Sequence, residues 1–371
     1  MKNIKILDKY IFFQVLGATA VCILLFSIIW IAPEILLRTV QRVLNGTYTV
    51  EMGISAILCE IPKILGNALP VGVLLGSLFT FDKLSKDSEI TVLRACGASF
   101  YRIIASALFL GVIIAGLSFV VRDRLIPYAS MNYDIMKRYN GGTHFVFPIK
   151  DEHNSMQRVI IVPDFRSYKI TNVVVLNFAK EENQKGNSIL NSIYMSDFVK
   201  YNEQTHDWTI NNATTYELSR EGVYEKVGNE KDITVLTGQR GENAYELMKF
   251  SLKRDRDMTN RELKRYIHLL KTEAMDDEYR FMLNKYLERF SQSIIAVLFV
   301  ILGCLLGFAK PRDHRVIGFT IAVIAIFLYY ITMPFLDMLA EKGILHPFIT
   351  AFLAPVVLYF LNRFLKQQKD L

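Results

Sequence analysis

The sequence predicts an α-helical membrane protein with six transmembrane helices, arranged three and three around an inserted β-rich domain. Two observations predict this fold class. Hydrophobic residues make up 51% of the 371 residues, and they are concentrated in residues 11–121 and 290–362, whereas residues 122–289 have ordinary soluble composition. Because water does not solvate long apolar segments, the bilayer must be part of this protein's solvent.

Each membrane crossing needs about 20 consecutive apolar residues in a helix. Six segments meet that requirement: residues 11–33, 53–81, 103–121, 290–309, 316–336 and 344–362. We therefore divide the chain into transmembrane helices 1–3 (residues 1–121), a β domain (122–257), a connecting amphipathic helix (258–289) and transmembrane helices 4–6 (290–371). The connecting helix is expected to start at the capping-box sequence Thr259-Asn-Arg-Glu262.

Basic residues indicate the orientation in the membrane. They cluster before the first span, in the second and fourth connections and after the last span. The residues are Lys2, Lys5, Lys9, Lys83, Lys86, Arg94, Arg102, Lys310, Arg312, Arg315, Arg363, Lys366 and Lys369. With six spans, all four clusters fall on one side, which the positive-inside rule makes cytoplasmic. We expect both termini in the cytoplasm and the β domain outside it.

The second span carries unusual polar residues in its outer half, namely Glu60, Pro62, Lys63, Asn67 and Pro70. Charges at that depth are costly unless they are paired or hydrated. Glu60 and Lys63 are three residues apart on one helix and can partly neutralise each other. Two interpretations remain open: the helix lines a wet cavity, or the span begins near residue 65 and the charges lie at the interface.

The inserted domain shows about eight short strand-like runs separated by turn residues, which is typical of a sandwich or jelly roll. The runs are His144–Ile149, Arg158–Val162, Asn172–Phe178, Ser188–Val199, Trp208–Ile210, Thr214–Ser219, Gly222–Val227 and Asp232–Leu236. Such a domain can hold an acyl chain between its two sheets.

Several chemistries are missing from the sequence. It has no Gly-rich phosphate loop, its six histidines are scattered, and its four cysteines show no zinc-ligand spacing. The net charge of +7 comes from clusters at span ends, which argues against a nucleic-acid surface. We expect no catalytic site, metal or cofactor, so any ATP-driven work must come from a partner chain.

The connection between the second and third spans contains a short helix near residues 85–99. It places Ile90, Leu93 and Gly97 on one face, with Glu89 and Arg94 beside it. An apolar face with charged flanks suits a groove on a partner protein. The alternative is a helix that lies flat on lipid.

The whole chain resembles the LptF/LptG permease family, also called YjgP/YjgQ, the membrane subunits of the lipopolysaccharide-export ABC transporter. The matching pieces are Leu7-Asp-Lys-Tyr10, Leu69-Pro-Val-Gly-Val-Leu-Leu75, Ser88-Glu-Ile-Thr-Val-Leu-Arg-Ala-Cys-Gly97, Met258-Thr-Asn-Arg-Glu-Leu-Lys-Arg-Tyr-Ile267 and Pro311-Arg-Asp-His-Arg315 with Gly318. Their order and spacing carry the resemblance. It does not separate the two subunits. The loop Glu89–Gly97 is more similar to LptF, whereas Leu7-Asp-Lys-Tyr10, the Pro62-Lys63 pair and Pro347-Phe-Ile-Thr-Ala351 in the last span are more similar to LptG.

The resemblance implies a subunit of the bacterial inner membrane that has a periplasmic β-jellyroll-like domain and is not itself an enzyme. It would pair with a second LptF/LptG-type subunit above an LptB-type ATPase dimer. Lipopolysaccharide would pass from the membrane lipid through a jellyroll to an LptC-type periplasmic protein. Two alternatives are an ABC-linked mechanotransmitter or lipoprotein-release subunit, and a membrane scaffold that transports nothing.

Carried over by motif, Glu89, Leu93, Arg94 and Gly97 belong to the helix that would couple to the ATPase. Lys63 falls where LptG-like sequences carry a basic residue facing the lipid A phosphates, and its neighbour Glu60 shares the expected substrate-binding site. Arg38 and Arg42 are further candidates for that site. A lysine or arginine near the interface pairs well with phosphate, although simple snorkelling explains Arg38 and Arg42 equally well.

Overall fold

The computed structural model describes residues 6–31, 35–130, 143–150, 155–166, 169–180, 188–219, 222–308 and 315–369. The chain folds into two compact units. The helical unit comprises Met1–Met136, Arg256–Asn260 and Arg280–Leu371, and the β unit comprises Lys137–Asp255 and Arg261–Tyr279. Most of the Pro311–Arg315 motif lies outside the described residues.

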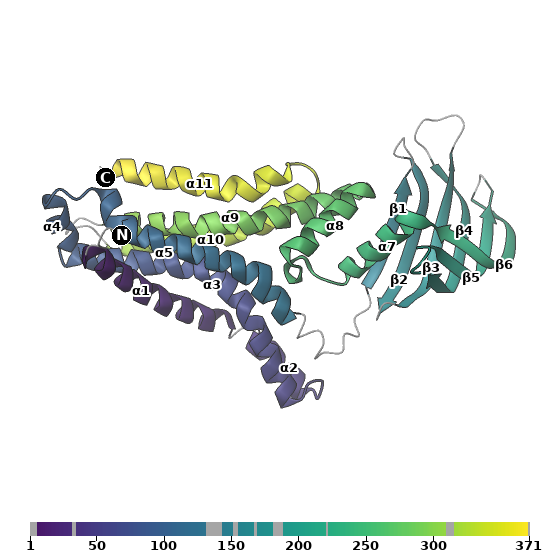
Figure 1. The fold of residues 1–371 in the computed structure, drawn as a ribbon, viewed down its shortest axis with the longest axis horizontal. Coiled ribbons are helices and arrows are strands. Elements are labelled where there is room, and N and C mark those ends of the chain that lie inside the picture. The colour runs from purple at the N-terminus through teal and green to yellow at the C-terminus, as the bar shows by residue number, and fades with distance from the viewer. Residues whose placement is uncertain are drawn as a thin grey trace. The chain divides into compact units, whose positions relative to one another are not determined.

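In the described residues, the helical unit contains six helices that are long and apolar enough to cross a membrane. They are α1 (Ile6–Ile31), α3 (Val50–Lys86), α5 (Phe100–Val120), α9 (Asp276–Gly307), α10 (Arg315–Glu341) and α11 (Pro347–Gln368). Two short helices, α2 (Leu37–Leu44) and α4 (Glu89–Ala95), flank α3, and a π-helical turn, η2 (Val121–Leu125), follows α5. The predicted arrangement of three helices, a β domain and three helices is confirmed (Figure 1).

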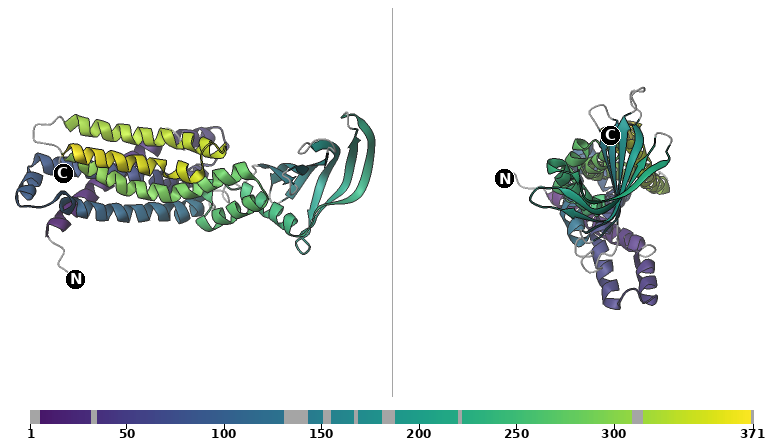
Figure 2. Two further views of the ribbon diagram at one scale, coloured as in Figure 1. Left: turned by 90° about the horizontal axis from the view of Figure 1, so that it is seen from above. Right: turned by 90° about the vertical axis from the view of Figure 1, so that its right-hand side faces the viewer.

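The start of α1 and the end of α11 lie at the end of the bundle that carries α4 (Figures 1 and 2). Two contacts tie α11 to this end. Lys366 donates to the Tyr101 hydroxyl of α5 at 2.8 Å, and Lys369 donates to the carbonyl oxygen of Leu305 of α9 at 2.8 Å. A cation at the carboxyl end of a helix is stabilising, because the last carbonyl groups there have no partner within the helix. Lys366 and Lys369 therefore lie at the end of the bundle that carries α4, as the charge pattern predicts.

Helix α3 is the centre of the bundle. In its most apolar 18-residue window 78% of the residues are buried, compared with 22% in α1 and 11% in α10. Glycines allow this close packing: a Cβ atom at Gly76 would lie 2.5 Å from the Thr19 Cα atom of α1. A Cβ atom at Gly307 of α9 would lie 2.6 Å from the Leu78 carbonyl oxygen. Backbones that touch in this way are typical of small-residue faces on membrane helices.

Within the ranges that the structure describes, the β unit is built on six antiparallel strands. They are β1 (Thr143–Lys150), β2 (Met156–Arg166), β3 (Lys169–Lys180), β4 (Ser188–Tyr201), β5 (Trp208–Leu218) and β6 (Tyr224–Leu236), paired in sequence order. The elements that follow are α7 (Gly238–Ser251), the 3-10 turn η3 (Asp255–Asp257) and α8 (Asn260–Thr272). The inserted antiparallel β domain is therefore confirmed.

The number of strands differs from the prediction of about eight. Two pairs of predicted runs merge, since β5 contains both Trp208–Ile210 and nearly all of Thr214–Ser219, and β6 joins the last two runs. The asparagines between the runs resemble turn residues, but Asn212 adopts a left-handed φ of 51° inside the strand and the pairing continues on both sides of it. The described strands form one sheet rather than two facing sheets.

One side of the sheet faces the core of the β unit. Phe145 and Phe147 of β1 are 5% and 0% exposed, as the two-residue period of a strand requires. Helix α7 packs on the sheet at Gly241, whose carbonyl oxygen accepts a hydrogen bond from the Trp208 indole at 2.9 Å. A Cβ atom at Gly241 would lie 1.9 Å from the His206 carbonyl oxygen, so only glycine fits there.

Helix α8 starts at the predicted position, but its first turn is capped from another element. The Asp123 carboxylate accepts the backbone N–H of Asn260 at 2.7 Å. Glu262, the last residue of the predicted capping box, accepts a hydrogen bond from Lys253 at 2.6 Å. An acidic group at a helix amino end is favourable wherever it comes from in the sequence, because it meets N–H groups that lack a helical partner.

The glycine packing of α3 gives a direct prediction. Gly76→Ala inserts a methyl group into the α1 backbone and should destabilise the protein by about 1–3 kcal/mol, the usual cost of overpacking. Gly116→Ala on α5 is the matched control, because a Cβ atom there meets nothing within 4 Å. Thermal unfolding in detergent measures both variants, and equal melting temperatures would contradict the packing account.

Candidate functional site

Helix α4 holds the residues predicted to couple to an ATPase. It is bracketed by two left-handed residues, Ser88 with φ of 59° and Gly97 with φ of 84°. The left-handed φ angles turn the chain sharply on both sides of α4. Glycine adopts this conformation without strain, whereas serine does so at a cost. The predicted helix is present but shorter than residues 85–99, because Ser85 belongs to α3.

The apolar face of α4 points into its own bundle. Ile90 is 3% exposed and belongs to the main core cluster, and Leu93 packs against the same cluster. The Arg94 guanidinium lies 5.9 Å from the centre of the Phe308 ring. By contrast with Ile90, Val92 on another side of α4 is 59% exposed. The side of α4 that remains for a partner therefore differs from the face that helical periodicity suggests, and Leu93 serves the core.

Glu89 is the first residue of α4, and its carboxylate contacts α1. Its Oε1 atom accepts a hydrogen bond from the Tyr10 hydroxyl at 3.0 Å. Two residues earlier in α1, Asp8 forms a bidentate pair with Arg102 of α5 at 2.6 and 2.8 Å. The Leu7-Asp-Lys-Tyr10 motif thus joins the start of α1 to both neighbouring elements, a role that its sequence alone does not reveal.

The predicted substrate-binding residues share the hairpin formed by α2 and the first half of α3. Lys63 and Glu60 form an ion pair at 3.4 Å, and their side chains are 32% and 27% exposed. The Arg42 guanidinium donates to the Tyr48 hydroxyl at 3.1 Å and lies 5.4 Å from the centre of its ring. Arg38 is an exposed residue of α2. The hairpin extends away from the other helices (Figures 1 and 2), so its cations lie at the surface.

Proline in α3 explains an arginine that sequence reasoning missed. Pro70 has no N–H group, so the Gly66 carbonyl oxygen four residues earlier loses its helical partner. The Arg122 guanidinium of η2 donates to that oxygen at 3.0 Å and to the Asn67 side chain at 3.2 Å. The Tyr330 hydroxyl of α10 donates to the Asn67 carbonyl oxygen at 2.9 Å. A proline inside a span was the signal that such donors are needed.

A second missed group is a buried polar cluster between α9, α10 and α11. Lys285 contacts two carboxylates, Glu288 at 3.2 Å and Asp337. Asn284 is fully buried, donates to Asp337 at 2.8 Å and accepts from the Thr350 hydroxyl at 2.7 Å. Residues 284–288 precede the predicted fourth span and Asp337 directly follows the predicted fifth, so their meeting depends on the helix packing.

The other side of the β sheet presents apolar residues that are partly exposed. Strand register places them in two rows across neighbouring strands. The rows are Pro148, Val159, Leu176, Ile193, Tyr216 and Val227, and Val146, Ile161, Val174 and Met195. Val146, Met195 and Val227 are 44%, 42% and 60% exposed, and the others are half-buried. We call these ten residues the apolar face.

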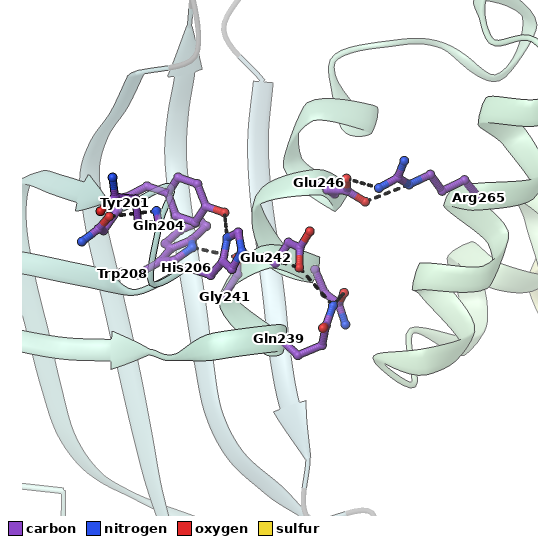
Figure 3. A network of polar contacts seen from close by, with 11 residues as sticks. Tyr201, Gln204, His206, Trp208, Gln239, Gly241, Glu242, Glu246 and Arg265 are labelled. Atoms are coloured by element: carbon purple, nitrogen blue, oxygen red, sulfur yellow. Dashed lines mark hydrogen bonds and ion pairs between the residues drawn. The ribbon is translucent and has the colours of Figure 1, made fainter.

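Polar contacts hold α7 on the sheet (Figure 3). The Tyr201 hydroxyl lies 2.8 Å from His206 Nδ1, and His206 Nε2 lies 3.9 Å from the Glu242 carboxylate. Burial, followed by the nearby Glu242 charge, raises the pKa of the Tyr201 phenol. Its ring also stacks on Tyr245 at 4.0 Å. These contacts fix α7 against β4 and β5, so we assign them a structural role.

Among the described residues no three His, Cys, Asp or Glu side chains are grouped closely enough to hold a metal ion. The surfaces described above are the exposed cationic hairpin and the short helix α4 in the helical unit, and the partly exposed apolar sheet in the β unit.

In the described part of the chain, six helices long and apolar enough to span a membrane, interrupted by such a sheet, define a multi-pass membrane protein. The family model "Lipopolysaccharide export system permease LptF/LptG" matches residues 9–366, and the chain belongs to this family. It is also similar to the lipopolysaccharide export system permease protein LptF of Escherichia coli (strain K12) and of Shigella flexneri, with 26% identity over 129 residues in each case. These matches cover 35% of this chain and 35% of the relatives, so the chain matches about a third of their length.

The buried cluster gives the second prediction. Lys285→Met leaves the buried Glu288 and the half-buried Asp337 without their ammonium partner, which should cost about 3–5 kcal/mol of stability. Lys285→Met combined with Asp337→Asn also removes the Asp337 carboxylate and should recover part of that loss. Lys342→Met, at an exposed position, is the control. Denaturation in detergent micelles compares the variants, and a single variant as stable as the control would refute the ion-pair account.

Proposed function

We propose that this chain is a permease subunit of an ATP-driven transporter that takes lipopolysaccharide out of the bacterial inner membrane and passes it to a periplasmic bridge. Membership of the LptF/LptG family supports the transport role. Under this proposal the chain hydrolyses no ATP itself, α4 faces the cytoplasm together with both termini, and the β unit lies in the periplasm.

The apolar face of the β sheet is the structural observation that carries the proposal. Its ten residues form two rows that give acyl chains an apolar surface open on one side. Partly exposed apolar patches of this kind mark interaction sites on proteins. An amphipathic lipid that leaves a bilayer must keep its acyl chains out of water, and the apolar face offers that protection.

The cationic hairpin supplies the complementary chemistry for the lipid head group. Lys63 is about one third exposed, so its ammonium can exchange Glu60 for a phosphate group of lipid A. A charge-assisted hydrogen bond to phosphate is stronger than a neutral one. Arg38 and Arg42 on the same hairpin add positive charge for the same anion.

Three exposed surfaces of the described structure suit the three proposed protein partners. Helix α10 is the least buried span, which suits pairing with a second LptF/LptG-type subunit. The exposed side of α4 suits the groove of an LptB-type ATPase dimer. Strand β6 pairs with β5 and forms an edge of the described sheet, so an LptC-type periplasmic protein can extend the sheet there by strand addition.

Two other functions make different demands on the structure. A mechanotransmitter or lipoprotein-release subunit would move without carrying lipid, and its usual layout places the outer domain between the first and second spans. Here the β unit follows the third span. A scaffold that transports nothing leaves both α4 and the charged hairpin without a role.

Photocrosslinking in cells that make lipopolysaccharide tests the proposal. A photoreactive residue in place of Lys63, Arg38 or Met195 should form adducts with lipopolysaccharide, because these positions lie on the hairpin and the apolar face. The matched controls are Lys231, an exposed residue of β6, and Phe360, an exposed residue of α11. Adducts at the control positions alone would contradict the proposal. If no position forms adducts while a residue beside Glu89 crosslinks to an ATPase, the mechanotransmitter is favoured.

A further inference from the structure

The start of α1 is tied to α5 by a charged contact with defined geometry. Both oxygens of the Asp8 carboxylate accept hydrogen bonds from the Arg102 guanidinium, at 2.6 and 2.8 Å. The Ser106 hydroxyl, one turn further along α5, donates to Asp8 at 3.2 Å. A bidentate arginine–carboxylate pair fixes orientation as well as distance. The first turn of α1 therefore keeps a set direction relative to α5.

A second contact ties α1 to α4. Tyr10 lies two residues after Asp8, and its hydroxyl donates to Glu89 Oε1 at 3.0 Å. Glu89 is also the α4 residue expected to meet a cation on the ATPase. The same carboxylate thus faces a tyrosine of α1 on one side and the proposed partner surface on the other.

The elements joined by these contacts differ in how firmly they are held. Helix α4 is short and is bounded by left-handed residues at Ser88 and Gly97, where the chain direction can change without bending a long helix. Helix α1 is only 22% buried in its apolar window, whereas α3 is 78% buried. Apart from its close contact with α3 at Gly72 and Gly76, most of α1 is not buried, so few other side chains oppose a displacement of its first turn.

We infer that Tyr10 and Asp8 are positioning residues that carry a displacement of α4 to α1. Tyr10 makes α1 follow Glu89 when a partner moves α4. The Asp8–Arg102 pair provides the pivot about which α1 swings against α5. This inference rests on the proposed function, because it assigns the motion to an ATP-driven transport cycle and names α1 as the helix that moves.

Spectroscopy on the assembled complex can follow this motion directly. The complex contains this chain, its paired permease subunit and the ATPase, reconstituted in vesicles containing lipopolysaccharide. Spin labels replace Val21 of α1 and Val357 of α11, which are 59% and 57% exposed, in a background without the four native cysteines. Distance distributions are measured without nucleotide and with trapped ADP–vanadate.

The key variant is Tyr10→Phe, which removes one hydroxyl and keeps the ring. Tyr128→Phe is its control, because Tyr128 is a 69% exposed tyrosine near the far end of the third span. We expect trapped nucleotide to shift the Val21–Val357 distance in the control but not in Tyr10→Phe. ATP hydrolysis should change less than about twofold, while lipopolysaccharide released per ATP falls about fivefold, the loss expected for one hydrogen bond of ordinary strength.

The pivot is tested by charge exchange. Asp8→Asn should abolish the nucleotide-dependent shift, and Asp8→Arg combined with Arg102→Asp should restore part of it. Unchanged melting temperatures of the variants in detergent separate this positioning role from a merely structural one. A wild-type shift in both Tyr10→Phe and Asp8→Asn overturns the inference. If the shift depends on Tyr10 but no lipopolysaccharide leaves even the wild-type vesicles, the relay stands and the proposed transport function fails.

Discussion

Close packing of α3 against α1 and α9 is the constraint on which the helical unit depends. Gly72 and Gly76 admit the α1 backbone on one side, and Gly303 and Gly307 bring α9 against the other. In a bilayer the helices gain little from burying apolar side chains, because lipid is equally apolar, so backbone contact and dispersion forces must hold them together. The remaining described helices then pack around these three.

A rigid α3 links the two places where function is expected. The Lys63–Glu60 pair lies in its first half, and α4 follows its last turn. With 37 residues, α3 spans roughly 55 Å, enough to cross the bilayer with several turns to spare. At the α4 end, the hydrogen bond between Tyr10 and Glu89 joins α4 directly to α1. The carbonyl oxygen freed by Pro70 is held by Arg122, which keeps α3 supported at its proline.

The sequence predicted the features that depend on local pattern and left out those that depend on packing. Apolar length gave the six spans, and alternation gave the β domain. The merging of strands at Asn212 escaped prediction, because an asparagine with a left-handed φ is typical of turns, whereas here it lies inside a strand whose pairing continues in register. Leu93 was assigned to a partner on helical periodicity, which identifies an apolar face but not what covers it. The Asp8–Arg102 and Lys285–Asp337 pairs join residues far apart in the sequence, so no spacing rule reveals them.

The central claim is that ATP hydrolysis on a partner drives lipid out of the membrane through this chain. Its most direct test is release of radiolabelled lipopolysaccharide from vesicles containing the complete complex to a soluble periplasmic acceptor. We expect lipopolysaccharide release that requires ATP. Release should stop when the ATPase is inactive or when the soluble periplasmic acceptor is left out. Hydrolysis that proceeds with no lipopolysaccharide leaving the vesicles would contradict it and would identify the chain as a transmitter of motion alone.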